Sequence, residues 1–233
     1  MDGNPDAQSI PAQELVSRLL ADPPEVHAIG GEFGAAPPLG ILATDADCYT
    51  FLARRSAGGS HTLETGCGIS TLVFAGRGAA HTCVVRFQAE VDRLTSYCES
   101  HDIDISRVTF QIGWSDDVLP TLTAGEPLDL VLVDGGHGFP TPVLDWYYAG
   151  GRLRQGGILV LDDIQLRAVA DLARFLDRDG RWKRLERTDK WCAYERLSEG
   201  PLREEAVHQL FWPAPLPVRL RRLPQKVRSR LGR

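Results

Sequence analysis

The chain has 233 residues, of which 43% are hydrophobic and 24% are charged, and its formal net charge is −5 at pH 7. These are ordinary values for a globular chain, and the length suffices for one α/β domain with a good core. The five cysteines are scattered, odd in number and without a C-x-x-C spacing, which argues against a disulfide framework or a zinc site. No apolar run reaches membrane-span length and the first residues lack a signal-peptide pattern, so we expect a cytoplasmic protein without stable membrane insertion.

Basic residues are concentrated at the C-terminal end. Residues 213–233 contain seven basic residues and no acidic one, whereas the rest of the chain has 19 basic against 31 acidic residues, a net charge of −12. Such a tail could bind nucleic acid or an anionic membrane, or it could fold onto its own acidic body or onto a second subunit. Four prolines and the absence of aromatic residues after Trp212 favour the second alternative. We therefore predict no nucleic-acid partner and leave a homo-oligomer open.

Residues 1–60 are predicted to form an N-terminal helical cap and loop. Apolar residues recur at helical spacing over residues 12–20, and residues 45–55 have a similar pattern. Residues 21–40, between them, are rich in proline and glycine, which is typical of a loop.

From residue 61 onward, short apolar strands alternate with helical segments. Strands are predicted around Leu63 and at residues 82–85, 108–112, 128–133, 157–161, 182–186 and 191–195. Helices are predicted at residues 69–74, 91–98, 116–122, 142–153 and 166–176. This alternation predicts a Rossmann-like doubly wound sheet of about seven strands, mostly parallel, with an antiparallel terminal hairpin. The domain would span residues 61–197, and residues 198–233 would form a C-terminal helix and the basic tail.

A glycine-rich turn stands between the first strand and the helix that follows it. Gly66 and Gly68 allow close approach of a ligand to the backbone, and the helix start supplies unpaired N–H groups. A dinucleotide fingerprint would have a third glycine where Thr71 stands. Instead, Glu64 precedes the first glycine by two residues, and its carboxylate would suit a cationic part of a ligand. The spacing resembles the first cofactor motif, E/D-x-G-x-G, of class I S-adenosylmethionine-dependent methyltransferases.

Polar residues also follow the other predicted strands. In open α/β sheets ligands bind beyond the carboxyl ends of the strands, so these residues are candidates for one site. They are Ser115 and Asp116 after the third strand, Asp134 and His137 after the fourth, and Asp162 and Asp163 after the fifth.

Two further stretches indicate one branch of that family. They are residues 130–137, Leu-Val-Leu-Val-Asp-Gly-Gly-His, and residues 156–164, Gly-Gly-Ile-Leu-Val-Leu-Asp-Asp-Ile. Both are similar to the catechol and macrocin O-methyltransferase-like branch of that family. The resemblance implies a divalent cation, with Mg²⁺ first among the candidates, held by Asp134, Asp162 and Asp163. Independently, three carboxylates at neighbouring strand ends would repel one another, and a hard cation would relieve that repulsion. The alternative is that the aspartates cap the following helices, Asp163 especially.

The resemblance also implies catalytic roles for two residues. His137 would be the general base, because its pKa lies near neutrality, and Asp134 would lie near both the cofactor and the metal. Alternatively, His137 is a solvated residue of the loop or a metal ligand.

The cofactor implied by the resemblance is S-adenosylmethionine. Its predicted contacts are Glu64, Gly66, Cys67, Gly68, Ser70, Gln88, Ser115, Asp116 and Asp134. The chain departs from the family after the second strand, where Arg86-Phe87-Gln88 replaces the usual acid that binds the ribose hydroxyls. Gln88 or Glu90 would have to take over this contact.

The predicted function is metal-assisted O-methylation of a hydroxyl on a small-molecule substrate. Trp146, Tyr147 and Tyr148 could line a substrate pocket, although aromatic residues at this spacing more often lie in the core. Two other functions stay open, an NAD(P)-dependent oxidoreductase and a non-catalytic relative that binds a nucleoside.

Overall fold

The computed structural model describes residues 10–27, 43–122 and 125–203, and the structural statements below concern these residues. The chain divides into two compact units, residues 1–200 and 201–233. Most of the predicted loop at residues 21–40 and nearly all of the predicted C-terminal helix and tail lie outside the described ranges, and the predicted domain boundaries stay predictions. None of the described helices is long and apolar enough to cross a membrane.

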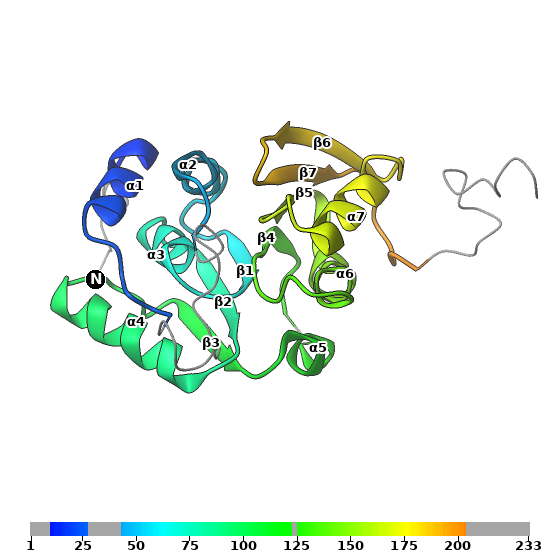
Figure 1. Ribbon diagram of the computed structural model, residues 1–233. Helices are drawn as coiled ribbons and strands as arrows, with labels where there is room; N and C mark the ends of the chain where they lie inside the picture. The colour runs from blue at the N-terminus through cyan, green and yellow to red at the C-terminus, as the bar shows by residue number, and fades with distance from the viewer. Residues whose placement is uncertain (1–9, 28–42, 123–124, 204–233) are drawn as a thin grey trace, which may run out of the picture. The chain divides into compact units, whose positions relative to one another are not determined.

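One seven-stranded sheet forms the centre of the fold (Figure 1). Its strands are β1 (His61–Thr65), β2 (Ala80–Val85), β3 (Val108–Ile112), β4 (Leu128–Val133), β5 (Leu153–Leu161), β6 (Trp182–Arg187) and β7 (Cys192–Arg196). Their order is β3-β2-β1-β4-β5-β7-β6. Strands β1 to β5 are parallel, and β7 pairs antiparallel with both β5 and β6. The predicted Rossmann-like sheet with an antiparallel terminal hairpin is confirmed, although the antiparallel strand β7 lies one position inside the edge.

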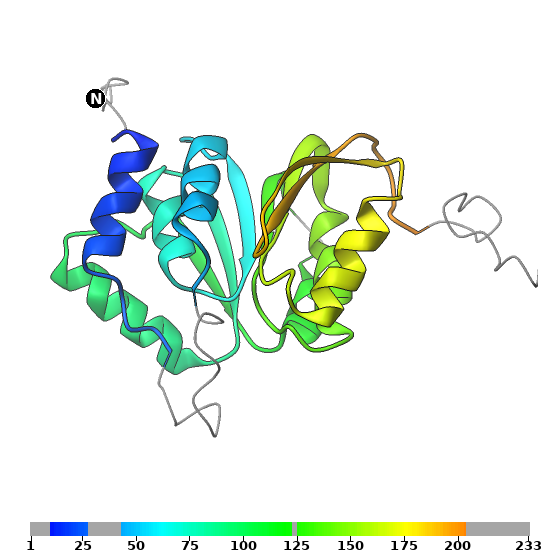
Figure 2. The ribbon, with the colours of Figure 1, turned by 45° about the horizontal axis from the view of Figure 1, so that its top comes forward.

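Helices cover both faces of this sheet (Figures 1 and 2). They are α1 (Ala12–Ala21), α2 (Ala46–Arg55), α3 (Ile69–Gly76), α4 (Gln88–Ser100), α5 (Ser115–Val118), α6 (Thr141–Asp145) and α7 (Arg167–Leu176), with short turns η1 (Leu119–Thr121) and η2 (Trp146–Gly150). Helices α1 to α4 contribute to one large apolar core cluster with the sheet, and α5 to α7 lie on the opposite face. Burial on both faces explains why β4 and the end of β5 have continuous apolar sequences.

The helix predicted at residues 142–153 is shorter than expected. It continues from α6 into one π-helical turn, η2, and β5 already begins at Leu153. Gly150 is the last residue of η2 and Gly151 follows it, and glycines are common at helix ends. Trp146 is buried and packs edge-on against Phe175, in agreement with the core role that is more common for aromatic residues at this spacing, whereas Tyr147 is exposed.

Asp145, in α6, is the buried carboxylate with the least support. Its side chain is fully buried, and neither oxygen has a hydrogen-bond partner within normal distance among the described residues. Burial raises its pKa to about 6, and the nearby hydroxyls of Ser115 and Thr65 only partly oppose that rise. The fold therefore favours the protonated form of Asp145.

Asp145→Asn is expected to stabilise the protein at neutral pH and to change little near pH 4. A carboxyl whose pKa rises from 3.8 to about 6 on folding stabilises the protein below pH 3.8, and this contribution is lost as the pH rises through 6. The contribution of this carboxyl to the free energy of unfolding therefore changes by about 3 kcal/mol between low and high pH, at 1.36 kcal/mol per pKa unit. Urea unfolding at pH 4 and pH 8 measures it. Asp171→Asn, at an exposed ion pair with Arg174, is the control, and parallel pH dependence of the Asp145→Asn and parent chains would contradict the assignment.

Candidate active site

A cavity of about 880 Å³ opens at the carboxyl ends of the parallel strands. It lies where the sheet order reverses, since β1 pairs with β2 on one side and with β4 on the other. Ligands of open α/β sheets bind at such a switch point. Its walls come from the segments that follow β1, β2, β3 and β4, together with residues 23–27 after α1. Of the four strand ends predicted to converge, those of β1, β3 and β4 line the cavity, and the end of β2 lines it as well. The end of β5 does not line it, although Asp163 lies 3.1 Å from His137 in the wall.

Gly66 is held at the closest approach of two strand ends. It has φ +93°, a left-handed conformation that favours glycine, and a Cβ atom there would lie 2.5 Å from the Asp134 carbonyl oxygen. Gly68 differs, because a Cβ atom at that position would meet no atom within 4 Å. Both glycines line the cavity, so Gly66 fixes the shape of the turn and Gly68 leaves space for a ligand.

Glu64 lies beneath the glycine turn and does not line the cavity, which differs from its predicted role as a ligand contact. Its Oε1 atom accepts hydrogen bonds from the Thr71 hydroxyl and lies 3.0 Å from His81 Nε2. The Thr71 hydroxyl in turn accepts a 3.1 Å hydrogen bond from the Gly68 N–H. Thr71 thus has a structural function at the position where a dinucleotide fingerprint has glycine. The carboxylate of Glu64 holds the turn through these contacts.

The part of the wall that follows β2 and β3 is basic and aromatic. The Arg86 guanidinium lies 3.7 Å from the centroid of the Trp114 ring and 4.5 Å from that of Phe87, and all three residues line the cavity. Glu90, in the first turn of α4, also lines it, and its Oε1 atom lies 2.8 Å from His27 Nδ1. The acid missing from the end of β2 is therefore present one helical turn later.

The remaining predicted cofactor residues divide into two groups. Those in the cavity wall are Cys67, Ser70, Ser115 and Asp134. Those outside it are Gln88, which is exposed and donates a hydrogen bond to Asp92, and Asp116, which is exposed in α5. Both residues are exposed in the first turn of their helices, α4 and α5.

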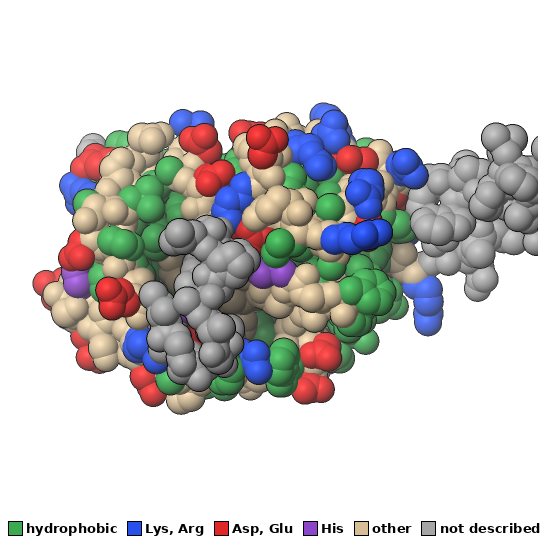
Figure 3. Space-filling model, viewed as in Figure 1, with side chains coloured by type: hydrophobic (Ala, Val, Ile, Leu, Met, Phe, Trp, Pro, Cys, Tyr) green, Lys and Arg blue, Asp and Glu red, His purple; other side chains and the backbone are tan. Residues whose placement is uncertain are grey.

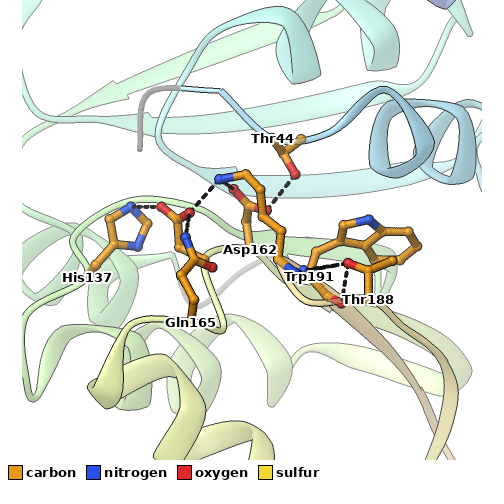
Figure 4. A network of polar contacts seen from close by, with 8 residues as sticks. Thr44, His137, Asp162, Gln165, Thr188 and Trp191 are labelled. Atoms are coloured by element: carbon orange, nitrogen blue, oxygen red, sulfur yellow. Dashed lines mark hydrogen bonds and ion pairs between the residues drawn. The ribbon is translucent and has the colours of Figure 1, made fainter. Parts of the chain in front are cut away.

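The two aspartates that follow β5 form a buried polar network with residues from three other segments (Figure 4). Thr44, just before α2, donates a 2.5 Å hydrogen bond to Asp162 Oδ1, and Gln165 donates one of 2.7 Å to Asp163 Oδ1. His137 and Thr44 lie on opposite sides of this pair. The alternative role for Asp163, capping a helix, is not adopted, because α7 begins only at Arg167 after Leu166.

His137 lies in the cavity wall beside Asp163. Its Nε2 atom is 3.1 Å from Asp163 Oδ2, and its side chain is 18% exposed. Burial lowers the pKa of His137 below its ordinary value, and the neighbouring carboxylates only partly oppose this. The imidazole is therefore neutral near pH 7, the form that a general base requires.

Lys190 is the charged member of the network that the sequence patterns did not indicate. Its ammonium donates a 2.5 Å hydrogen bond to Asp163 Oδ1 and lies 3.6 Å from Asp162 Oδ2. Burial lowers the pKa of this ammonium, but the neighbouring carboxylates outweigh that effect and raise it above the ordinary value. Burial also raises the pKa of Asp134, and the negative charges of Asp162 and Asp163 raise it further. One lysine cation thus stands among three aspartates.

The predicted three-aspartate metal site is not assembled in the expected way. Asp134, His137 and Asp163 offer ligand atoms that lie within 4.8 Å of one another, a spacing that a cation could bridge, but Asp162 is not part of this group. A divalent ion shared by the two adjacent aspartates would have to displace the Lys190 ammonium, since like charges at such distances repel strongly. The described residues therefore do not fit an ion that Asp162 and Asp163 hold together, as the prediction requires.

Comparisons with known proteins agree with this architecture. Residues 63–164 match the family described as "Methyltransferase domain" (Methyltransf_24). No curated protein sequence matches the chain.

Three solved structures illustrate the shared fold. The O-methyltransferase TomG from Streptomyces achromogenes, involved in tomaymycin synthesis and solved in complex with SAM, is 18% identical, covers 79% of this chain and 90% of its own, and has a TM-score of 0.60. Cofactor-bound Rv0187 from MTB is 18% identical, with coverages of 84% and 99% and a TM-score of 0.59. A putative rRNA-methylase from Clostridium thermocellum is 14% identical, with coverages of 68% and 100% and a TM-score of 0.53. The predicted methyltransferase resemblance is confirmed.

Proposed function

We propose that this protein transfers the methyl group of S-adenosylmethionine to a hydroxyl oxygen of a small molecule, starting from the match of residues 63–164 to the methyltransferase domain family. One observation carries the proposal: the glycine turn and His137, which lies 3.1 Å from the buried Asp163, line one cavity at the switch point of the sheet. A cofactor at the turn and a base beside it are the two elements that methyl transfer to oxygen needs.

The cofactor would lie along the first half of the cavity wall. Its methionine part would contact the turn at Gly66 and Gly68, as the spacing predicted. Glu90 would accept hydrogen bonds from the ribose hydroxyls, with its position fixed by His27. The Trp114 ring beside Ser115 offers a face on which an adenine could stack.

His137 would accept the proton of the substrate hydroxyl. The Asp163 carboxylate faces Nε2, which favours a proton on that atom and leaves the lone pair of Nδ1 to act as the base. Bound S-adenosylmethionine would supply an activated methyl group and would leave as the neutral thioether, and His137 would take up the proton that the hydroxyl loses. Fixing acceptor oxygen, methyl and sulfur in line supplies most of the catalysis in such a step.

We do not propose metal assistance, because the ammonium of Lys190 already lies between Asp162 and Asp163, which were predicted to hold the ion. An oxidoreductase is disfavoured because the Thr71 side chain fills the place of the third fingerprint glycine. Titration calorimetry with S-adenosylmethionine, S-adenosylhomocysteine and NAD tests the cofactor. Binding of NAD alone would support the oxidoreductase, and cofactor binding without methyl transfer to any hydroxyl substrate would support the non-catalytic relative.

Nucleic acid is not expected to be the substrate. On the face shown in Figure 3, lysine and arginine side chains gather over β6, β7 and α7. Three basic residues of β6 are paired with acids: Arg184 and Arg187 with Asp177, and Lys183 with Glu195. Paired charges release few counterions, and the net charge of −5 opposes phosphate binding.

We expect single-stranded RNA to bind no more tightly than the non-specific range, about 10⁻⁴–10⁻⁶ M at physiological salt. Fluorescence anisotropy with a labelled RNA at several salt concentrations measures this affinity. The control is a chain truncated after Trp212, which lacks the basic residues of the tail. Tight and salt-sensitive binding by the full chain, lost in the truncated one, would show that the tail recruits nucleic acid.

A further inference from the structure

The turn between β6 and β7 lies at the edge of the candidate site because of how β7 pairs. Strand β7 runs antiparallel to β5, so the residues just before β7 lie beside the residues just after β5. Cys192 pairs with Leu161, and the backbone carbonyl of Lys190 accepts a 2.8 Å hydrogen bond from the Ile164 N–H. The turn is thereby tied to the segment that carries Asp162 and Asp163.

The backbone of this turn is fixed as well as placed. The Thr188 hydroxyl accepts hydrogen bonds of 3.1 and 3.0 Å from the N–H groups of Lys190 and Trp191. The Trp191 side chain is fully buried and packs against Phe51 of α2. Figure 4 shows Thr188 and Trp191 next to the carboxylate network. The side chain of Lys190 therefore begins from an anchored position.

Burial favours a cation next to the two carboxylates. The side chains of Asp162 and Asp163 are 1% and 0% exposed, and that of Lys190 is only 15% exposed. Each aspartate has its Oδ1 atom hydrogen-bonded, whereas its Oδ2 atom has no hydrogen-bond partner among the described residues. These Oδ2 atoms face the Lys190 ammonium at 3.6 Å and His137 Nε2 at 3.1 Å. Two buried charges without a counter-charge would be strongly destabilising.

We propose that the Lys190 ammonium is the resident cation of this site and occupies the place of a divalent metal between Asp162 and Asp163. Lys190 does not line the cavity among the described residues, so it acts as a positioning residue. It holds Asp163 Oδ1, and Asp163 Oδ2 faces the base His137. The role of Lys190 in positioning the base rests on the proposed function. With this ammonium in place, methyl transfer is independent of added metal.

The inference can be tested without a substrate by measuring Mn²⁺ binding to the purified full chain. Electron paramagnetic resonance detects free Mn²⁺, so a titration gives the affinity directly. Lys190→Met keeps a long side chain and removes the charge, and it is expected to bind Mn²⁺ at least about tenfold more tightly than the parent chain. The matched control is Lys183→Met on β6. The Lys183 ammonium lies 3.9 Å from Glu195, so this substitution removes only a surface partner. Adding Asp162→Asn to Lys190→Met should abolish the gained site.

Two results would overturn the proposal. One is tight Mn²⁺ binding by the parent chain that Asp162→Asn removes, because the three aspartates would then form the predicted metal site. The other is a folded Lys190→Met chain with no gain in Mn²⁺ affinity. If Lys190→Met does not fold, Lys190→Gln takes its place. The Mn²⁺ titration of the parent chain still tests whether the aspartates form a metal site.

A second readout separates this inference from the proposed function. Lys190→Arg keeps the positive charge and should retain weak Mn²⁺ binding, as the parent chain does. Calorimetry with S-adenosylmethionine in metal-free buffer tests the cofactor proposal on the same samples. Failure to bind the cofactor would reject the proposed function but leave the Mn²⁺ result standing, and a metal requirement for cofactor-dependent turnover would reject only the role of Lys190.

Discussion

Replacing His137 with alanine is expected to lower the rate of methyl transfer by roughly 10²–10⁴-fold, the range that general bases contribute. The imidazole lies in the cavity wall, and burial lowers its pKa, so the neutral form is available at pH 7. Nothing in the glycine turn depends on this side chain, since the turn is held by Glu64 and Thr71. The affinity for S-adenosylmethionine should therefore change little, and the loss should appear in kcat.

The control for this experiment is His101→Ala. His101 is a surface histidine that lies 3.0 Å from Asp22 and stacks on Tyr97, remote in the fold from the strand ends. That variant should keep full turnover. Single-turnover kinetics with saturating cofactor separate the chemical step from product release. A His137→Ala enzyme with unchanged turnover would mean that solvent or the cofactor pocket itself removes the proton, and the proposed base would be wrong.

Gly68→Val is expected to weaken S-adenosylmethionine binding by roughly 5- to 150-fold without unfolding the protein. The position lies at φ 165°, close to extended backbone, and a Cβ atom there meets no atom within 4 Å. The valine side chain would therefore occupy cavity space that the cofactor needs, and overpacking of this kind costs about 1–3 kcal/mol. Calorimetry gives the affinity, and thermal unfolding shows whether the fold is intact.

Gly58→Val is the matched control, because Gly58 is exposed in a turn away from the cavity and also has no atom within 4 Å of its Cβ position. Gly66 is the less suitable choice, although its spacing from Glu64 singled it out. A side chain at Gly66 would collide with the backbone of Asp134, so a loss of binding could arise from a disturbed fold. Equal cofactor affinities of the Gly68→Val and parent chains would place the ligand elsewhere in the cavity.

Local patterns determined much of the fold. The apolar runs of β4 and β5 and the alternation of strands with helices predicted a parallel sheet, because burial on both faces requires such sequences. The Glu-x-Gly-x-Gly spacing located the turn correctly, since glycine is required where two strand ends approach. His137 and Asp134 were placed in the cavity by their positions after β4.

Side-chain directions were harder to predict. Glu64 has the spacing of a ligand contact, yet its carboxylate is used by Thr71 and His81 beneath the turn. Gln88 and Asp116 stand near the cavity in sequence, but their side chains lie on the solvent side. Helix rotation relative to the sheet decides such directions, and that rotation depends on packing across the whole face.

The sequence by itself determined which strands carry carboxylates to the edge of the sheet, because strand ends can be read from local apolar runs. Only the tertiary structure decided which positively charged side chain lies beside these carboxylates. Lys190 lies 27 residues beyond Asp163 in a turn that looks like an ordinary hairpin connection. It reaches the site because β7 pairs with β5 rather than lying at the edge, and strand pairing at that separation is set by the packing of the complete sheet.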